Sequence, residues 1–394
     1  MSEEFIGLSV PNLKGNELKY VTNAIETEWV STAGPYVTQF EEKIAEYVHT
    51  DCAVSCQSGT AGLHTALIVC DVKPGDLVIA PTLTFIAAVN PIKYVGADPV
   101  FMDCDDSLCI DPVRLKEFCE TECELRESLG DSNGKVLVHK VTGRRVSAMI
   151  LVHVFGNMAD IESIKNITDE YGIKLIEDAT EAIGTYYTSG KYKGRYAGTI
   201  GDVGVYSFNG NKIITTGGGG MIVSSDNELL AHAKHLTTQA KSDEALFYHD
   251  EIGYNYRMTN IQAALGLAQL EQLEDFIEIK RRNYELYKEL LADEKGVKIL
   301  PFSDNARSNH WFYSLILSDE YKFDKFGLIN HLKSAGIQSR PIWGLISDQK
   351  PYEGALCYKV EKARYYWQRV VNLPCSTNLS EEDVKRVVKQ ITGK

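Results

Sequence analysis

The sequence has too few positive charges for a protein that binds nucleic acid. Its 394 residues include 41 lysines and arginines against 54 aspartates and glutamates, a formal net charge of −13 at pH 7. Nucleic-acid binding needs clustered lysine and arginine to neutralise phosphates. The acidic balance therefore argues against a nucleic-acid partner. It does not exclude a small phosphorylated ligand, which backbone amides and one or two cations can hold.

Long apolar segments are also missing. The most apolar run, residues 146–156, contains Ser147 and His153 and is shorter than the roughly 20 residues that a membrane-spanning helix needs. The first residues show no basic start followed by an apolar stretch, so we expect no secretory signal. We therefore expect a cytoplasmic protein that does not contact membranes.

The nine cysteines lack the spacing of a metal site. Cys52 and Cys56 are close in sequence, as are Cys104 and Cys109, but no C-x-x-C pair occurs. Zinc sites usually show tighter, repeated ligand spacing. We expect no bound metal, and free, mostly buried thiols in a reducing compartment.

Short apolar runs alternate with segments of helical periodicity over residues 1–250. This alternation predicts a large α/β domain with a mostly parallel central sheet. Residues 251–394 are predicted to form a smaller C-terminal α+β domain, which one long helix at residues 260–291 connects to the first. The strands expected in the large domain are 76–81, 99–103, 148–154, 174–177, 203–208 and 220–224.

Residues 121–147 interrupt this alternation. The dipeptides Asn133-Gly134 and Thr142-Gly143 lie on either side of the run KVLVHK. Such turn residues beside a short apolar run predict a hairpin insertion. The sequence leaves open whether the hairpin is a surface excursion or lies near a substrate.

A lysine stands just after a predicted strand and before a glycine-rich turn. Lys212 follows the strand at 203–208 and precedes four glycines at 217–220. A lysine in an enclosed site can act as a nucleophilic amine that forms a Schiff base, and glycines let the backbone pass close to a ligand. The alternative is a surface lysine beside a flexible turn.

Acidic side chains follow another predicted strand, in the sequence LIEDATEA at 175–182. Open α/β sheets bind their ligands at the carboxyl ends of the strands. There, the carboxylate of Asp178 could pair with a protonated pyridine nitrogen and keep that ring an effective electron sink. The alternative is a solvated strand end with a helix N-cap at Asp178.

Two further segments have the composition of phosphate contacts. Ser58-Gly59-Thr60 opens a predicted buried helix whose N-terminus could cradle a phosphate, although it is neither a Walker loop nor a G-x-G-x-x-G fingerprint, and a simple capped helix is the alternative. Residues 253–260 (GYNYRMTN) precede the long helix. They could provide ordinary capping, or amide and guanidinium contacts to phosphate.

In this order, the motifs resemble the DegT/DnrJ/EryC1/StrS family of sugar aminotransferases. The resemblance covers nearly the whole chain and implies the aspartate-aminotransferase-like fold (fold type I) and the cofactor pyridoxal 5′-phosphate. The matching motifs are SGT at 58–60, PTLTFIAAVN at 81–90, HVFGNMADI at 153–161, EDATEAIG at 177–184, SFNGNK at 207–212, TTGGGGMI at 215–222 and GYNYRMTNIQAALGLAQL at 253–270.

The resemblance implies two catalytic residues. Lys212 is similar to the Schiff-base lysine, which also serves as general acid and base, and Asp178 is similar to the partner of the pyridine nitrogen. Family members that dehydrate sugars carry histidine at the position of Lys212, so this chain resembles a transaminase. The other implied cofactor contacts are Ser58, Gly59, Thr60 and Ser207 to the phosphate, Phe85 stacking on the ring, and Asn255 reaching the phosphate of a neighbouring subunit.

Four residues are predicted at the site on weaker grounds. Glu181 stands where many members have glutamine or histidine, close to the ring hydroxyl, and a carboxylate there is repelled by a phenolate unless one of the two is protonated. Arg257, beside Asn255, is expected to contact the substrate, as are His310 and Arg340. The resemblance also implies a homodimer with shared active sites.

The finer resemblance concerns the substrate. Residues 15–41 and the hairpin around 133–146 are similar to the subgroup that forms 4-amino-4,6-dideoxy-N-acetylhexosamines for legionaminic acid or bacillosamine-type pathways. We therefore expect transfer of an amino group from L-glutamate to the C4 ketone of a nucleotide-linked 4-keto-6-deoxy-N-acetylhexosamine. The alternatives are a 3-aminotransferase acting on a dTDP- or GDP-linked 3-keto-6-deoxy sugar, and a non-catalytic protein that senses cofactor or nucleotide-sugar.

Overall fold

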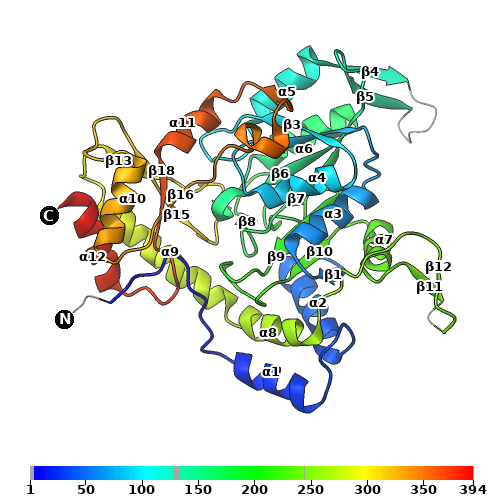
Figure 1. The fold of residues 1–394 in the computed structure, drawn as a ribbon, viewed down its shortest axis with the longest axis horizontal. Helices are drawn as coiled ribbons and strands as arrows, with labels where there is room; N and C mark the ends of the chain where they lie inside the picture. The colour runs from blue at the N-terminus through cyan, green and yellow to red at the C-terminus, as the bar shows by residue number, and fades with distance from the viewer. Residues whose placement is uncertain (1–3, 128–133, 244, 394) are drawn as a thin grey trace.

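The computed structural model describes residues 4–127, 134–243 and 245–393 (Figure 1). Its main feature is an eight-stranded mixed sheet with the order β1-β10-β9-β7-β6-β2-β3-β17, in which only β10 pairs antiparallel with its neighbours. The strands are β1 Ala53–Cys56, β2 Leu77–Pro81, β3 Asp98–Met102, β6 Val146–Val152, β7 Lys174–Asp178, β9 Val203–Ser207, β10 Gly220–Val223 and β17 Leu356–Tyr358.

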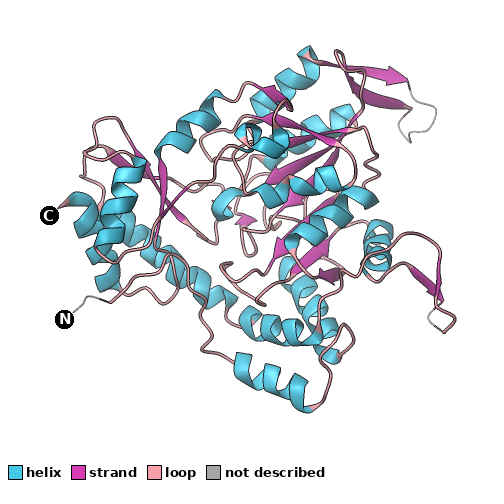
Figure 2. Ribbon diagram, in the orientation of Figure 1, coloured by secondary structure: helices cyan, strands magenta, loops and turns pink. Residues whose placement is uncertain are grey.

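The central strands are mostly apolar because helices and loops bury both faces of the sheet. Every residue of β2, β6 and β9 is buried, as expected for parallel strands covered on both sides. Helix α3 packs against β7, β9 and β10 and is itself almost wholly buried. Figure 2 shows these helices around the sheet. The sheet prediction is confirmed, with strand ends shifted by one or two residues.

Helices make up most of the remaining structure. Among the described residues, no helix is both long and apolar enough to span a membrane. The helices are α1 Glu17–Glu26, α2 Pro35–Val48, α3 Gly59–Val69, α4 Asn90–Tyr94, α5 Pro112–Thr121, α6 Ile161–Tyr171, α7 Asn227–Thr237, α8 Asn260–Leu270, α9 Leu273–Leu290, α10 Lys325–Ser334, α11 Glu361–Arg369 and α12 Glu381–Thr392, with short 3-10 turns at Ile86–Ala88, Val154–Gly156, Ile346–Asp348 and Lys350–Tyr352.

A second, antiparallel sheet of four strands lies in the C-terminal segment, with the order β13-β15-β18-β16. Helix α9 leads from α8 to this sheet, beside α10 and α12 (Figure 1). Its strands are β13 Val297–Ile299, β15 Tyr313–Leu317, β16 Arg340–Pro341 and β18 Val370–Leu373; the short paired strands elsewhere are β4 Cys123–Glu127, β5 Lys135–His139, β8 Tyr186–Tyr187, β11 Lys241–Asp243, β12 Tyr248–His249 and β14 Ala306–Arg307.

Residues 260–291 form two helices, so the prediction of one continuous helix is wrong. The backbone N–H of Gln272 bonds to Gln269 instead of Ala268, and the Gln272 side-chain amide donates to the Ala268 carbonyl. This side chain therefore takes the acceptor that the next turn of an α-helix would use. The chain bends here, so that α8 packs against α1 and α2 while α9 reaches the small sheet.

Other segments cross the predicted boundary at residue 250. Strand β17 extends the large sheet by pairing parallel with β3, and Ile6 forms a bridge to Ile337 beside the small sheet. The predicted hairpin insertion is confirmed as β4 and β5, which pair antiparallel; its expected turn residue Asn133 lies outside the described residues. The two units are therefore connected at three or more points along the chain.

Candidate active site

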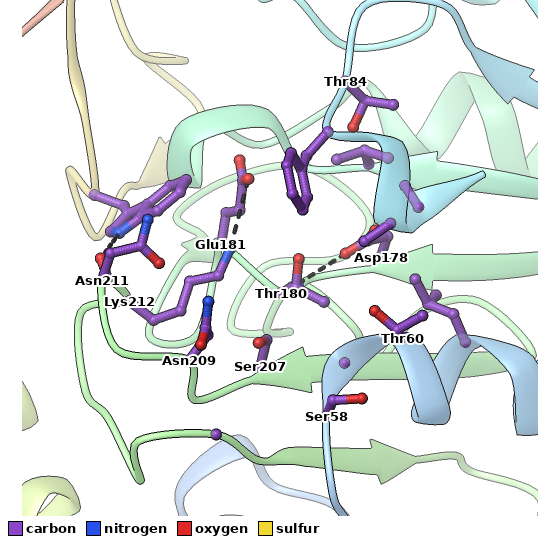
Figure 3. A pocket seen from close by; sticks show the side chains of 18 of the residues that line it. Ser58, Thr60, Thr84, Asp178, Thr180, Glu181, Ser207, Asn209, Asn211 and Lys212 are labelled. Carbon is purple, nitrogen blue, oxygen red and sulfur yellow. Dashed lines mark hydrogen bonds and ion pairs between the residues drawn. The ribbon is translucent and has the colours of Figure 1, made fainter. Parts of the chain in front are cut away.

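A cavity of about 340 Å³ lies at the carboxyl edge of the large sheet (Figure 3). This is a typical size for a small-molecule site. Strands β6, β7 and β9 end here, and the N-terminus of α3 follows β1 at the same edge. The described lining includes Ser58, Gly59, Thr60, Thr84, Phe85, Val152, Asp178, Thr180, Glu181, Ser207, Asn209, Asn211, Lys212, Gly218, Gly219, Trp311 and Trp343.

The amine of Lys212 lies inside this cavity. Its side chain is 12% exposed, and Nζ lies 3.6 Å from Oε1 of Glu181. On its other side, Nζ lies 4.2 Å from the ring centroid of Trp311, whose Nε1 donates a hydrogen bond of 2.8 Å to the carbonyl of Asn211. The alternative of a surface lysine is therefore wrong.

Asp178 is the last residue of β7 and is buried in the same cavity. Burial raises the pKa of its carboxyl, while hydrogen bonding from Thr180, including a 3.0 Å bond from the backbone N–H to Oδ1, opposes that shift. Among the described residues, no cationic side chain forms an ion pair with this carboxylate. No helix begins here, so the N-cap alternative is wrong. The carboxylate is available to a cationic group of a ligand.

The N-terminus of α3 has the properties of an anion site. Ser58 is its N-cap, and Oγ accepts a 3.1 Å hydrogen bond from Ala61 N–H. A Cβ atom at Gly59 would lie 2.8 Å from Thr180 Cγ2 and 3.0 Å from Ser207 Cβ, so only glycine fits. The first amides of the helix have no acceptor within it, and the helix dipole favours an anion there.

These groups fit pyridoxal phosphate. The helix N-terminus with Ser207 would hold its phosphate, Asp178 would pair with the ring nitrogen, and Lys212 would bond to its aldehyde carbon. One enclosed space thus contains a site for an anion, a carboxylate for a cation and an amine for a carbonyl group, and pyridoxal phosphate has all three. Phe85, which is 54% exposed at the cavity mouth, is free to contact the ring.

Glu181 lies in the cavity as expected, and its environment is distinctive. Its Oε2 accepts a 2.8 Å hydrogen bond from Phe155 N–H. Burial raises the pKa of Glu181 to about 7, against the opposing effects of the Lys212 ammonium and this hydrogen bond. The group can therefore gain or lose a proton near neutral pH.

His310 and Arg340 do not line the cavity, and their predicted contacts to the substrate remain predictions. The ring of His310 packs against Phe302 and Tyr284, with centroid distances of 4.5 and 5.0 Å, and its Nδ1 lies 3.0 Å from the Ser308 carbonyl. Arg340 is exposed in β16, where it pairs with Asn372 of β18. The His310 ring therefore packs within the C-terminal segment, whereas the Arg340 side chain faces solvent.

Asn255 and Arg257 also lie outside this protomer's cavity. Asn255 is exposed and forms a β-bridge to Thr238. Arg257 is partly buried, and its Nε atom is buried with no hydrogen-bond partner among the described residues. Their predicted contacts remain predictions.

Sequence reasoning missed two aromatic residues of the site, Trp311 and Trp343. Both come from the C-terminal segment and line the cavity. The run SNHWFY at 308–313 contains a possible signal, since aromatic residues clustered after a loop are frequent in binding sites. Only the way the two units pack shows which of these aromatics reaches Lys212.

One group of possible metal ligands occurs among the described residues, at the surface and away from the cavity. The ligand atoms of His235, Asp250 and Glu251 lie within 4.8 Å of one another. His235 is already paired with Asp250 at 2.7 Å. An exposed cluster of ion-paired side chains does not by itself indicate a metal site.

Comparison with known proteins agrees with this geometry. The chain is 36% identical to EpsN of Bacillus subtilis (strain 168), over 98% of this chain and 94% of that protein. It is also 36% identical to the GDP-perosamine synthase of Escherichia coli O157:H7, over 98% of each chain. The crystal structure of the aminotransferase TlmJ from Streptoalloteichus hindustanus superposes with a TM-score of 0.86 at 26% identity, covering 99% of this chain and 98% of that one.

The family model described as the DegT/DnrJ/EryC1/StrS aminotransferase family matches residues 11–392. The match spans both units and every part of the cavity described above. The chain therefore belongs to the DegT/DnrJ/EryC1/StrS aminotransferase family and is a pyridoxal-phosphate-dependent enzyme of fold type I.

Proposed function

We propose that the enzyme transfers the amino group of L-glutamate to the C4 ketone of a nucleotide-linked 4-keto-6-deoxy-N-acetylhexosamine, in the synthesis of a surface glycan. The observation that carries the proposal is the enclosure of Lys212 and Asp178 in one cavity with a helix N-terminus. The names of two relatives, both GDP-perosamine synthases, support a nucleotide-linked amino sugar as product. The position of the new amine and the N-acetyl group rest on the sequence resemblance.

The chain's own residues divide the work in this mechanism. Pyridoxal phosphate, when bound, supplies an electron sink that stabilises a carbanion at the carbon losing its proton. Lys212 is the amine of the cavity and moves the proton, first from Cα of glutamate and later onto the sugar carbon. Asp178 keeps a proton on the ring nitrogen, and the N-terminus of α3 fixes the phosphate. The buried walls exclude water from the reacting atoms.

Replacing Lys212 tests the aminotransferase activity itself. Lys212→Arg keeps a positive charge but cannot act as a neutral amine at ordinary pH, so we expect turnover to fall to background. The exposed Lys14 provides a matched control, since Lys14→Arg makes the same change far from the cavity. Full activity in Lys212→Arg would show that the mechanism is wrong.

The acceptor is tested with a panel of sugars. The enzyme and L-glutamate are incubated with UDP-, GDP- and dTDP-linked 4-keto and 3-keto sugars, and products are followed by mass spectrometry and NMR. We expect amination at C4 of a UDP- or GDP-linked N-acetylated sugar. The relatives' names favour a second candidate, a GDP-linked sugar without the N-acetyl group. Amination at C3 would favour the 3-aminotransferase, and absence of turnover with every sugar would favour a sensor.

We also propose a homodimer in which Asn255 completes the partner's phosphate site. Asn255 is exposed and outside its own cavity, and the neighbouring segment exposes apolar side chains, including Leu246, Phe247 and Ile252. The test mixes Lys212→Ala and Asn255→Ala chains, each inactive alone. Hybrid dimers with shared sites would regain up to about a quarter of the wild-type activity, because one site in each hybrid is intact. No regain would exclude a shared site.

We propose the cytoplasm as the compartment. All nine cysteines are free thiols, and seven of them are buried. Free thiols persist in reducing compartments. Labelling of native cells with a compartment-specific probe would test this.

A further inference from the structure

Glu181 faces the amine that must react. Its side chain is 4% exposed, and Oε1 points at Nζ of Lys212 across 3.6 Å (Figure 3). Oε2 is already held by Phe155 N–H. One oxygen therefore anchors the carboxylate while the other is left toward Lys212. Rotation of the long lysine side chain can shorten the 3.6 Å separation to hydrogen-bond length.

The carboxylate is fixed by backbone that folds in an unusual way to hold it. Phe155 adopts φ 58° and ψ 21°, the left-handed region that non-glycine residues seldom occupy. Gly156 follows at φ +82°, where a Cβ atom would lie 1.8 Å from Asn309 Oδ1. The Asn309 side-chain amide donates 2.9 Å hydrogen bonds to the carbonyls of Glu181 and Ile183. This arrangement aims Phe155 N–H at Glu181 and leaves the carboxylate little freedom.

Few other titratable groups face the pair. Asp178 is the other carboxylate of the cavity lining, and Cys109, behind Glu181, is a buried thiol whose pKa burial raises to about 12. His153, which follows β6, is already paired with Glu177, with Nε2 2.9 Å from Oε2. Among the described residues, the C-terminal segment contributes uncharged rings to this cavity, those of Trp343 and of Trp311, which lies against Nζ. Lys212 and Glu181 can therefore exchange a proton with each other more readily than with a third group.

We propose that Glu181 is the base that accepts the proton Lys212 must lose before its amine can attack the carbonyl carbon of pyridoxal phosphate. One N–H bond of the ammonium breaks and one O–H bond forms at Oε1. The electron pair left on Nζ then makes the new bond to carbon as the bond between that carbon and its oxygen breaks, and the oxygen takes the two remaining amine protons and leaves as water. The pair changes from two charges to none, and nothing is oxidised or reduced. Glu181 suits this exchange because burial raises its pKa to about 7. The role does not depend on which sugar the enzyme uses.

A purely electrostatic role for Glu181 makes the opposite prediction. A fixed carboxylate stabilises the ammonium beside it, so removing its charge would remove that stabilisation and speed the reaction. If Glu181 is the base, removing it slows the reaction even though the ammonium has lost its stabilising partner. The direction of the change thus separates the two roles.

The experiment follows cofactor uptake by the full-length apoenzyme, without any turnover. Apoenzyme is mixed with saturating pyridoxal phosphate between pH 6 and 9, and bond formation to Lys212 is followed by visible absorbance and confirmed by mass after borohydride reduction. Glu181→Gln keeps the size of the side chain and an acceptor for Phe155 N–H, but cannot take up a proton. We expect its uptake rate at pH 7 to fall about a hundredfold, the usual contribution of a general base.

Two further variants complete the test. Glu181→Asp keeps a base at a greater distance and should react faster than Glu181→Gln but slower than wild type. Glu289→Gln, an exposed glutamate on α9, makes the same charge change away from the cavity and should match wild type. A fall of less than about tenfold in Glu181→Gln, any rise, or a Glu181→Asp rate no faster than that of Glu181→Gln would overturn the proposal.

Discussion

The indole ring of Trp311 lies against the amine of Lys212, with Nζ 4.2 Å from the ring centroid. The two residues belong to different parts of the chain. Trp311 Nε1 donates a hydrogen bond to the carbonyl of Asn211, the residue before Lys212, and so connects the two segments. Docking of the C-terminal segment therefore determines how the reactive amine is held. A sheet edge alone would leave that amine open to water on this side.

Substitution of Trp311 should separate these two contacts. Trp311→Phe keeps an aromatic face but removes the Nε1 hydrogen bond to the Asn211 carbonyl, which also accepts from Ser9 Oγ. The loss should cost about 0.5–1.5 kcal/mol of stability. Trp311→Leu also removes the cation–π contact, which is about 0.5–2 kcal/mol. Urea denaturation checks stability, and the absorbance change of the bound cofactor with glutamate alone checks the first half-reaction. We expect the half-reaction to be slower in Trp311→Leu than in Trp311→Phe. Equal rates would mean that the aromatic ring beside Lys212 does not contribute to the rate.

Asp178→Asn should inactivate the enzyme without unfolding it. Asparagine keeps an oxygen that accepts from Thr180 N–H, but loses the negative charge that would stabilise a proton on the ring nitrogen of the cofactor. Breaking a buried charge pair costs about 2–5 kcal/mol, so we expect kcat to fall by about 30-fold or more. Rates with saturating cofactor, beside the exposed control Asp293→Asn, check this. A kcat within about threefold of wild type would exclude a pairing role for Asp178.

The cavity's sheet side could be predicted from the sequence because its residues follow strands of one direction. Asp178 and Ser207 are the last residues of β7 and β9, which are parallel neighbours in the sheet. Polar residues that directly follow the apolar run of a parallel strand are therefore expected at one common edge of the sheet. The N-cap at Ser58 could also be predicted, since serine, glycine and threonine are frequent at the start of a helix. Local chemistry and strand direction together bring these groups into one place.

The other side could not be predicted, because it depends on contacts between distant residues. Trp311 follows Lys212 by about a hundred residues, and no periodicity tells which aromatic of that segment faces the cavity. The bend at Gln272 depends on a side-chain hydrogen bond that competes with a backbone one. The packing of His310 could not be predicted for a similar reason: a histidine next to a buried strand gives no sign of whether its ring faces a ligand or two aromatic neighbours.

Ser58→Ala should weaken phosphate binding as well as the helix. Loss of the N-cap costs about 1 kcal/mol of stability, and the same change at Ser380, the N-cap of α12, provides a matched control far from the cavity. We expect both variants to lose similar stability in urea denaturation. Only Ser58→Ala should bind pyridoxal phosphate more weakly, by roughly threefold to tenfold, because it also disturbs the anion site. Equal affinities in the two variants would place the phosphate elsewhere.

His310 should make the fold sensitive to acid without affecting catalysis. Burial lowers the pKa of His310 to about 4, whereas in the unfolded chain it is about 6.5. Between these values the unfolded chain binds a proton that the folded chain does not, so stability is lost as the pH falls from about 6.5 to about 4, at up to about 1.4 kcal/mol per pH unit.

The substitution His310→Gln removes this proton-linked loss. The variant should be less stable than wild type at pH 8, because the ring no longer packs against Phe302 and Tyr284, and the difference should shrink as the pH falls toward 4. Urea denaturation across this pH range measures the two profiles, and parallel profiles would refute the effect. The KM for the sugar should stay within about twofold of wild type, because the ring lies outside the cavity. A large increase in KM with unchanged stability would instead indicate that His310 contacts the substrate.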